Sequence, residues 1–118
     1  MIRRTRLRKV SKKRAVQLKQ YSADRKEYLQ KHPFCQIYMR RFGLDEAEVM
    51  KNNGVYKEVT TGGQVHWIRV PWAQDIHHTR GRVGALLLLQ EYWMSASRDM
   101  HEWAHNNPTE ARRIGVLA

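Results

Sequence analysis

Two short stretches, DIHHTR at residues 75–80 and MHEWAH at residues 100–105, organise the rest of this sequence because they hold four of its six histidines. In the second stretch, His101 and His105 are separated by four positions. A helix would place both imidazoles on one face, one turn above the other. Two imidazoles in this arrangement can share one metal ion.

The first stretch supplies two further imidazoles, His77 and His78, which are adjacent in a segment that reads as extended. Their side chains therefore point to opposite faces or into a turn, so one can bind the ion while the other stays free. The pattern offers three nitrogen ligands, an open coordination position and a fourth imidazole that can take a proton from water, a set that suits metal-assisted hydrolysis. The alternative is that the pair on the helix is simply surface-exposed or half-buried, and the spacing alone does not define a reaction.

The composition describes a small folded protein. At 118 residues and 14.0 kDa the chain has room for one domain, and 42% hydrophobic residues with four Trp are typical of a packed core. The mean hydropathy of −0.73 and the lack of a long apolar run predict a soluble, cytoplasmic protein with no membrane partner. Cys35 is the single cysteine, so no internal disulfide can form, as is usual in a reducing compartment.

The charge is concentrated at one end of the chain. The net charge is +11, and residues 1–31 carry twelve Lys or Arg against two acidic residues, whereas the remainder is nearly balanced. Such a segment predicts binding to a polyanion, most simply a nucleic acid, although a solubilising tail, a ribosome-type contact or a membrane-surface contact would use similar residues. The residues expected to contact phosphates here are Arg3, Arg4, Arg6, Arg8, Lys9, Lys12, Lys13 and Arg14.

Periodicity and turn residues predict the remaining elements. We expect a flexible basic arm over residues 1–10, a basic amphipathic helix over residues 11–31, a turn or short strand over residues 34–38, a short helix over residues 44–52, a hairpin of residues 55–60 and 65–70, a buried apolar run over residues 85–89 and a final helix over residues 109–115. Trp67 and Trp72 are expected to pack the hairpin onto the body.

With these elements in place, the sequence resembles small HNH nucleases with a ββα-metal core, especially the short versions common in bacteriophage genomes. The resemblance covers most of the chain and rests on SKKRA at 11–15, YL at 28–29, HPFC at 32–35, IHHTRGR at 76–82 and HEWAHNNP at 101–108, of which the last two are the specific part. It implies an α+β fold with a single HNH-like domain over residues 11–118, a ββα-metal (His-Me finger) core over residues 75–105 and an inserted segment over residues 44–74.

The resemblance also implies roles for individual residues. His77, His101 and His105 would bind one divalent ion, and His78 would be the general base that activates water against a DNA phosphodiester. The ion could be Zn, Ni, Mn or Mg; three neutral imidazoles favour zinc, nickel or cobalt over magnesium. Double-stranded DNA is the expected partner, with other phage proteins as further partners.

Arg80 and Arg82 flank Gly81 in the loop after the two adjacent histidines. Their guanidinium groups could hold a neighbouring phosphate of the DNA. The alternative is an ordinary exposed basic turn.

The chain departs from the family pattern in three places. Where many relatives carry four cysteines that bind a structural zinc, this sequence has Cys35, Tyr38, Ser97 and Met100, so no structural zinc is expected. Instead, Tyr38 and Met100 should fill the space and Ser97 should cap the following helix. The position of the middle Asn of the motif, which supports the catalytic loop in the family, falls near Tyr92, so this Asn is missing here. The inserted segment over residues 44–74 is also longer than in the shortest relatives.

Two other functions use the same features. The chain could be a catalytically degenerate HNH fold that binds DNA without cutting it, as a component of a phage packaging or recombination complex. It could also bind RNA in the manner of a ribosomal protein, which the basic arm permits but the four histidines do not explain.

Removing residues 1–14 should weaken DNA binding strongly and flatten its salt dependence, because eight Lys or Arg side chains are lost. Each lost phosphate contact should lower the slope of log K against log salt by about 0.9. Fluorescence anisotropy with a labelled duplex between 50 and 200 mM salt, roughly the range over which such contacts are resolved, measures this slope. An unchanged slope would exclude this segment as the phosphate contact.

Overall fold

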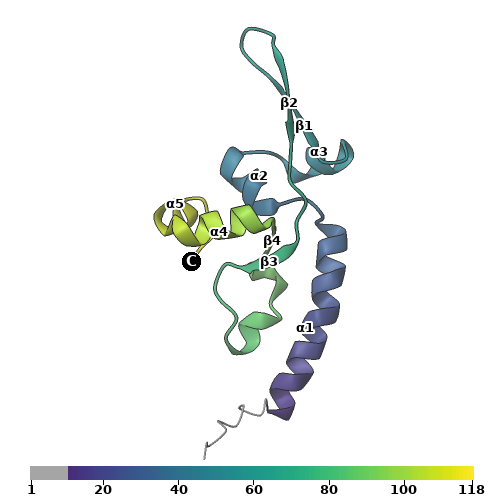
Figure 1. The fold of residues 1–118 in the computed structure, drawn as a ribbon, viewed down its shortest axis with the longest axis vertical. Coiled ribbons are helices and arrows are strands. Elements are labelled where there is room, and N and C mark those ends of the chain that lie inside the picture. The colour runs from purple at the N-terminus through teal and green to yellow at the C-terminus, as the bar shows by residue number, and fades with distance from the viewer. Residues whose placement is uncertain (1–10) are drawn as a thin grey trace, which may run out of the picture.

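The computed structural model describes residues 11–118 and shows a mixed α+β architecture, as the sequence predicted (Figure 1). The helices are α1 (Lys12–Lys31), α2 (Gln36–Phe42), α3 (Glu46–Lys51), α4 (Arg98–Asn106) and α5 (Pro108–Arg113). The strands are β1 (Val55–Val59), β2 (Val65–Arg69), β3 (Asp75–His78) and β4 (Trp93–Ala96), and two 3-10 turns, Gly84–Leu87 and Gln90–Tyr92, lie between β3 and β4.

Helix α1 begins and ends where the sequence predicted. The Ser11 hydroxyl accepts a hydrogen bond from the backbone N–H of Arg14 at 3.1 Å, and the helix ends at His32, before Pro33. The apolar contacts between this helix and the body start at Tyr21, and they are made by the buried Tyr28 and the partly buried Tyr21 and Leu29. The predicted apolar docking face therefore does not extend along the whole helix.

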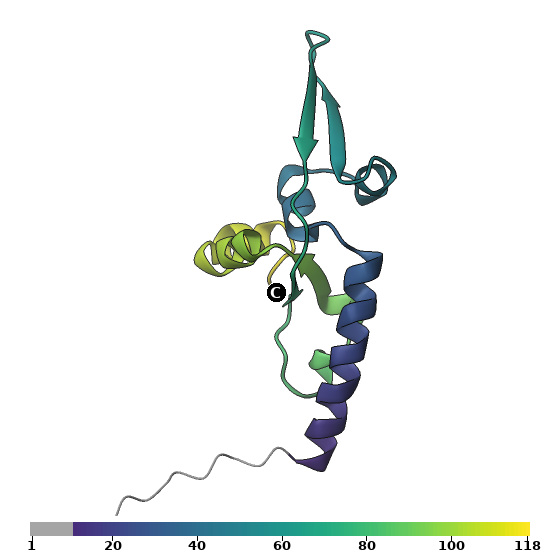
Figure 2. The same ribbon diagram turned by 45° about the vertical axis from the view of Figure 1, so that its right-hand side comes forward.

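The two antiparallel sheets are separate hairpins with different surroundings. In the first, β1 pairs with β2 from Val55↔Arg69 to Val59↔Val65, and this ribbon projects from the body (Figures 1 and 2). In the second, β3 pairs with β4 from Asp75↔Ala96 to His78↔Trp93. All of β4 is buried, so the second hairpin lies inside the body and can hold side chains in fixed positions.

Residues 34–38 correct the prediction of a strand or turn. Phe34 does form an isolated bridge with Trp72, but α2 starts at Gln36, directly after it. The Cys35 sulfur accepts a hydrogen bond from the Tyr38 N–H at 3.3 Å and so acts as the N-cap. The short apolar run did not reveal this helix because its cap is a cysteine, which is an uncommon capping residue.

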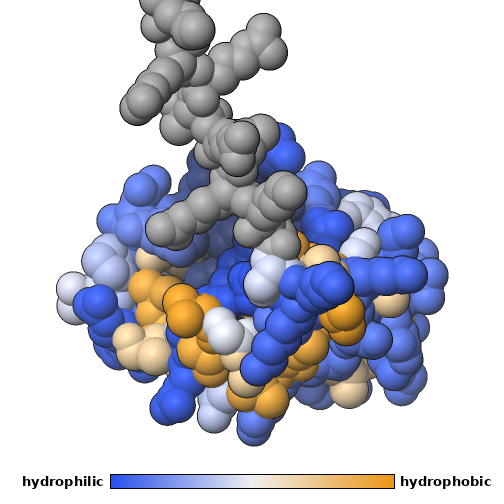
Figure 3. Space-filling model, turned by 90° about the horizontal axis from the view of Figure 1, so that it is seen from below, coloured by the Kyte–Doolittle hydropathy of each residue, from blue (hydrophilic) through white to orange (hydrophobic). Residues whose placement is uncertain are grey.

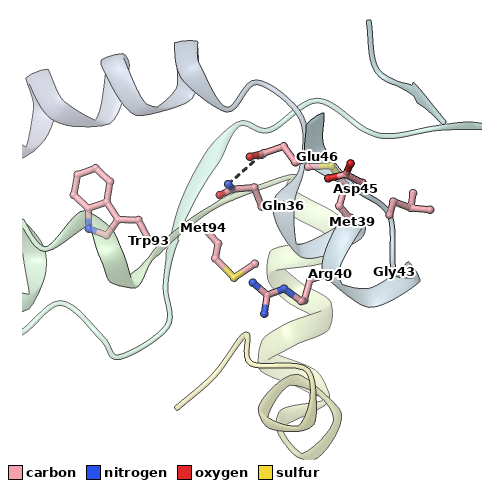
Figure 4. A pocket seen from close by; sticks show the side chains of 9 residues that line it. Gln36, Met39, Arg40, Gly43, Asp45, Glu46, Trp93 and Met94 are labelled. Atoms are coloured by element: carbon pink, nitrogen blue, oxygen red, sulfur yellow. Dashed lines mark hydrogen bonds between the residues drawn. The ribbon is translucent and has the colours of Figure 1, made fainter. Parts of the chain in front are cut away.

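The side-chain amide of Gln36 connects α2 to α1, α3 and β4. Figure 4 shows its bond to Glu46. Its Oε1 accepts hydrogen bonds from the Tyr28 hydroxyl at 2.7 Å and from the Ser95 N–H at 2.8 Å, and its Nε2 donates to Glu46 Oε2 at 3.0 Å. The same Tyr28 hydroxyl lies 3.0 Å from the Trp93 carbonyl oxygen, so its one proton is shared between two acceptors. The amide therefore connects α1 and α3 to β4, the strand that pairs with β3.

Three further predictions need correction. Trp67 does not pack on the body, since its side chain is 66% exposed, and Trp72 is also exposed although its ring contacts Phe34. The run over residues 85–89 is not a buried segment: only Leu87 is buried. The final helix spans Pro108–Arg113 rather than residues 109–115, because Pro108 occupies its first turn, where proline needs no hydrogen-bond donor.

Apolar side chains lie among hydrophilic ones at one end of the molecule (Figure 3). This end holds the start of α1 and the loop after β3. Val16, Val83 and Leu89 are exposed there. Among residues 11–118, no helix combines the length and hydropathy needed to cross a bilayer.

Replacing Gln36 by Ala should lower the free energy of unfolding by about 2–3 kcal/mol, because the Ser95 N–H loses its acceptor in a buried strand. Urea denaturation followed by circular dichroism measures this change. Gln20→Ala is the matched control, since Gln20 is exposed on α1 and bonds only to Asp24; it should cost less than about 0.5 kcal/mol. Equal losses in the two variants would contradict the role of the Gln36 amide.

Candidate metal centre

Strand pairing places the two adjacent histidines on opposite faces of β3. His77 is opposite Met94 and His78 is opposite Trp93. The His77 side chain is 1% exposed and points toward α4, where its ring lies 5.1 Å from that of His101. The His78 ring instead lies 5.6 Å from Tyr21 of α1 and 5.8 Å from Trp93. The prediction that one histidine is free while the other joins the cluster agrees with this geometry.

Helix α4 supplies the other two histidines. The Ser97 hydroxyl accepts a hydrogen bond from the Met100 N–H at 3.4 Å, so the helix begins at the predicted residue. His105 lies four positions after His101, and their rings are 4.9 Å apart. Tyr38 and Met100 pack against the core cluster that contains Cys35, as the sequence predicted.

The three histidines form a compact group. One ring nitrogen from each of His77, His101 and His105 lies within 4.8 Å of the others, an arrangement that could hold a metal ion. Two ligands of one tetrahedral zinc are about 3.4 Å apart, so small ring rotations would bring the three nitrogens to a shared ion. His78 is not in this group, but all four histidines line one hollow of about 280 Å³.

The hydrogen bonding of His77 leaves one nitrogen available. Its Nε2 lies 2.7 Å from the Val116 carbonyl oxygen, which can only accept, so Nε2 carries the proton. Its Nδ1 is buried and has no hydrogen-bond partner. Burial lowers the pKa of His77 from 6.5 to about 4. The nearby His101 and His105 lower it further, whereas the hydrogen bond to Val116 raises it. A neutral imidazole with a buried, unpartnered lone pair is the form that binds a metal ion.

Asp75 lies beside His101. Its Oδ2 is 3.6 Å from His101 Nδ1, which leaves the Nε2 side of that ring toward the cluster. Asp75 and His77 are two residues apart in a strand and therefore share a face. A carboxylate on the second nitrogen of a ligating histidine orients the ring and raises its basicity.

His78 is a neutral imidazole with a free ring nitrogen. Burial, helped by the nearby charge of Arg82, lowers the pKa of His78 from 6.5 to about 4, so the ring is neutral at neutral pH. Its Nε2 is buried without a hydrogen-bond partner. The ring thus carries an unused polar atom beside the cluster.

The two loop arginines occupy different surroundings. Arg82 lines the hollow with the histidines, and its guanidinium lies 5.3 Å from the ring of Tyr21. Arg80 stacks on Tyr92 at 4.8 Å, and it does not line that hollow. The Tyr92 carbonyl accepts from the Thr79 N–H at 2.8 Å and from its hydroxyl at 3.1 Å, so the backbone of Tyr92 closes the loop after His78.

The structure brings together some of the predicted basic residues. Lys13, Arg14 and Arg82 line one open hollow next to the histidines, and Lys12 is exposed at the start of α1. Arg3, Arg4, Arg6, Arg8 and Lys9, with the predicted arm over residues 1–10, lie outside the described residues.

Sequence reasoning missed two groups in the site. Asp75 could have been found, because a carboxylate two positions before a histidine in a strand shares its face. The Val116 carbonyl carried no signal, because any residue supplies a backbone oxygen. Its position 39 residues after His77 follows only from the fold.

The donor set fits a borderline metal ion. Three imidazole nitrogens suit zinc, nickel or cobalt, whereas magnesium prefers oxygen ligands.

Comparison of the chain with protein-family models, curated proteins and solved structures found no match.

Replacing His101 by Ala should weaken Zn²⁺ or Ni²⁺ binding at least about 100-fold, since one of three ligands is removed. Isothermal titration calorimetry measures the affinity, and a rise in Tm with added metal gives an independent readout. His66→Ala is the matched control because His66 is an exposed histidine on β2. Equal affinities in the two variants would contradict the assigned centre.

Proposed function

We propose that this protein is a metal-dependent DNA endonuclease with a ββα-metal core formed by β3, β4 and α4. The observation that carries the proposal is the buried His77, whose Nδ1 lacks a partner and whose ring lies 5.1 Å from His101 and 5.6 Å from His105, next to a neutral His78 outside that group. A merely structural histidine would have both polar atoms satisfied or exposed. The resemblance of residues 76–82 and 101–108 to HNH nucleases supports the same assignment.

His77, His101 and His105 would hold one divalent ion, which would supply Lewis-acid stabilisation of the charge that develops on the scissile phosphate. His78 accepts a proton from the attacking water, whose oxygen forms a bond to phosphorus as the bond to the leaving oxygen breaks. Burial and the nearby charge of Arg82 keep His78 neutral, the form that can accept a proton, while the same lowered pKa makes it a weaker base than a free imidazole. Asp75 is the positioning residue for His101.

Arg82 is the better placed of the two loop arginines to hold a phosphate, because it lines the histidine hollow. It also borders the neighbouring hollow with Lys13 and Arg14. A DNA strand passing from one hollow to the other would meet cations on both sides of the reacting phosphate. These contacts bind the backbone without reading bases.

A second function, DNA binding without cleavage, is favoured by one observation. The position expected to hold the supporting Asn of the motif is Tyr92, whose side chain stacks on Arg80 instead of contacting the loop after His78. Its backbone carbonyl takes over the contact to Thr79. Cleavage therefore depends on whether this backbone contact holds His78 as firmly as an amide side chain would.

Purified protein should nick or linearise plasmid DNA in at least one of Mg²⁺, Mn²⁺, Ni²⁺, Co²⁺ and Zn²⁺, and EDTA should abolish the reaction. His78→Ala should reduce the cleavage rate by about 10²–10⁴-fold, because the proton acceptor is lost. Metal affinity and DNA affinity of this variant should remain close to wild type, since His78 is outside the ligand group. Cleavage by His78→Ala at the wild-type rate would disprove the assigned base, and DNA binding without cleavage in any ion would favour the non-cleaving function.

A further inference from the structure

The hairpin of β1 and β2 has one face that the body leaves uncovered. Alternate side chains of a strand share a face, so Val55, Lys57 and Val59 lie on the same side as their cross-strand partners Arg69, Trp67 and Val65. We name this set the hairpin face. Trp67 is 66% exposed and Val59 60% exposed, and Lys57 and Arg69 are exposed as well.

The opposite side of the ribbon is the one that packs. It carries Tyr56 and Ile68, of which Tyr56 contacts the buried cluster of Phe34, Met39, Val49 and Val70. The ribbon is thus attached at its base by Tyr56, and it projects away from the body in both views (Figures 1 and 2). Packing therefore accounts for the Tyr56 side and leaves the large apolar side chains of the hairpin face without a structural role.

The charges of the hairpin are sorted between its two sides. Lys57 and Arg69 lie on the hairpin face, whereas Glu58, the one carboxylate between residues 55 and 69, pairs with His66 on the opposite side. The Lys57 ammonium lies 5.7 Å from the Trp67 ring centroid, so the cation and the aromatic surface form one unit. The face is basic and aromatic, with small apolar side chains toward the tip.

We propose that the hairpin face is a second DNA contact, in which the ribbon lies in a groove of the duplex beside the cleavage site; this rests on DNA being the substrate of the proposed function. A two-stranded ribbon fits the major groove, which is about 12 Å wide. Lys57 and Arg69 neutralise phosphates at the groove edges, and Trp67, Val59 and Val65 cover sugar and base surface. Self-association through this face is disfavoured, because it would bring Lys57 and Arg69 of two copies together.

The position of the hairpin agrees with a contact that extends along the duplex. The ribbon and the basic start of α1 lie at opposite ends of the molecule, and β3, which carries His77 and His78, lies between them (Figures 1 and 2). A duplex held at the hairpin and at α1 is therefore held on both sides of the strand that carries the proposed site.

The test is DNA binding by the full chain in EDTA, where cleavage plays no part. Lys57→Ala/Arg69→Ala should weaken the affinity for a labelled duplex by roughly tenfold and lower the salt slope by about 2, as expected for two phosphate contacts. Trp67→Ala should weaken affinity severalfold with an unchanged salt slope. The matched control is Glu58→Gln/His66→Ala, which alters the opposite side of the same ribbon and should leave the affinity within about twofold of wild type.

The outcomes separate this inference from the proposed nuclease. A wild-type protein that cleaves DNA while the hairpin-face variants bind as tightly as wild type would overturn the hairpin contact alone. If the hairpin-face variants lose affinity and the wild-type protein cleaves DNA in none of the tested ions, the hairpin contact would be supported and the nuclease overturned. An equal loss of affinity in the control variant would show a general effect on the ribbon and would overturn the assignment to this face. Binding of a protein, and not of DNA, by the hairpin face would overturn it as well.

Discussion

The interaction on which the proposed chemistry depends is the hydrogen bond between His77 Nε2 and the Val116 carbonyl. It satisfies one nitrogen of a buried ring and assigns the proton to it, so that the other nitrogen keeps a free lone pair. A buried polar atom without a partner costs on the order of 1–3 kcal/mol, a cost that coordination to an ion would remove. The end of the chain and the β3–β4 hairpin thus define together the chemical state of one side chain.

The rest of the body holds that hairpin in place from the other side. Gln36 bonds to β4 and to residues of α1 and α3, and Tyr28 and Trp93 pack edge to face beside it. Because β4 is paired with β3, the bonds of Gln36 that fix β4 also fix the positions of His77 and His78. The side of β3 that faces α1 carries His78, the proposed proton acceptor, and the side that faces α4 carries His77, the proposed metal ligand. The alternation of side chains along the strand therefore separates the two proposed roles.

Local signals in the sequence were enough for much of this structure and for the histidine group. The spacing of His101 and His105, the Ser11 and Ser97 caps and the hairpin around residues 60–64 all depend on neighbours along the chain, and the structure agrees with each. The errors came from long-range packing, which those signals do not contain. Trp67 was expected inside because tryptophan is usually buried, but its strand position faces away from the body. The start of α2 was missed because it depends on the sulfur of Cys35, and the contact to Val116 was missed because a backbone carbonyl leaves no mark in a sequence.

The most direct test of the central claim is anomalous diffraction at the zinc edge from crystals grown with Zn²⁺. The account predicts one strong peak about 2.0–2.1 Å from a ring nitrogen of each of His77, His101 and His105, with the Nδ1 atom of His77 as its ligand and His78 uncoordinated. A peak coordinated by His78 would contradict the division of roles between the two faces of β3. The absence of a peak at the three histidines, in crystals that bind zinc elsewhere, would contradict the metal centre itself.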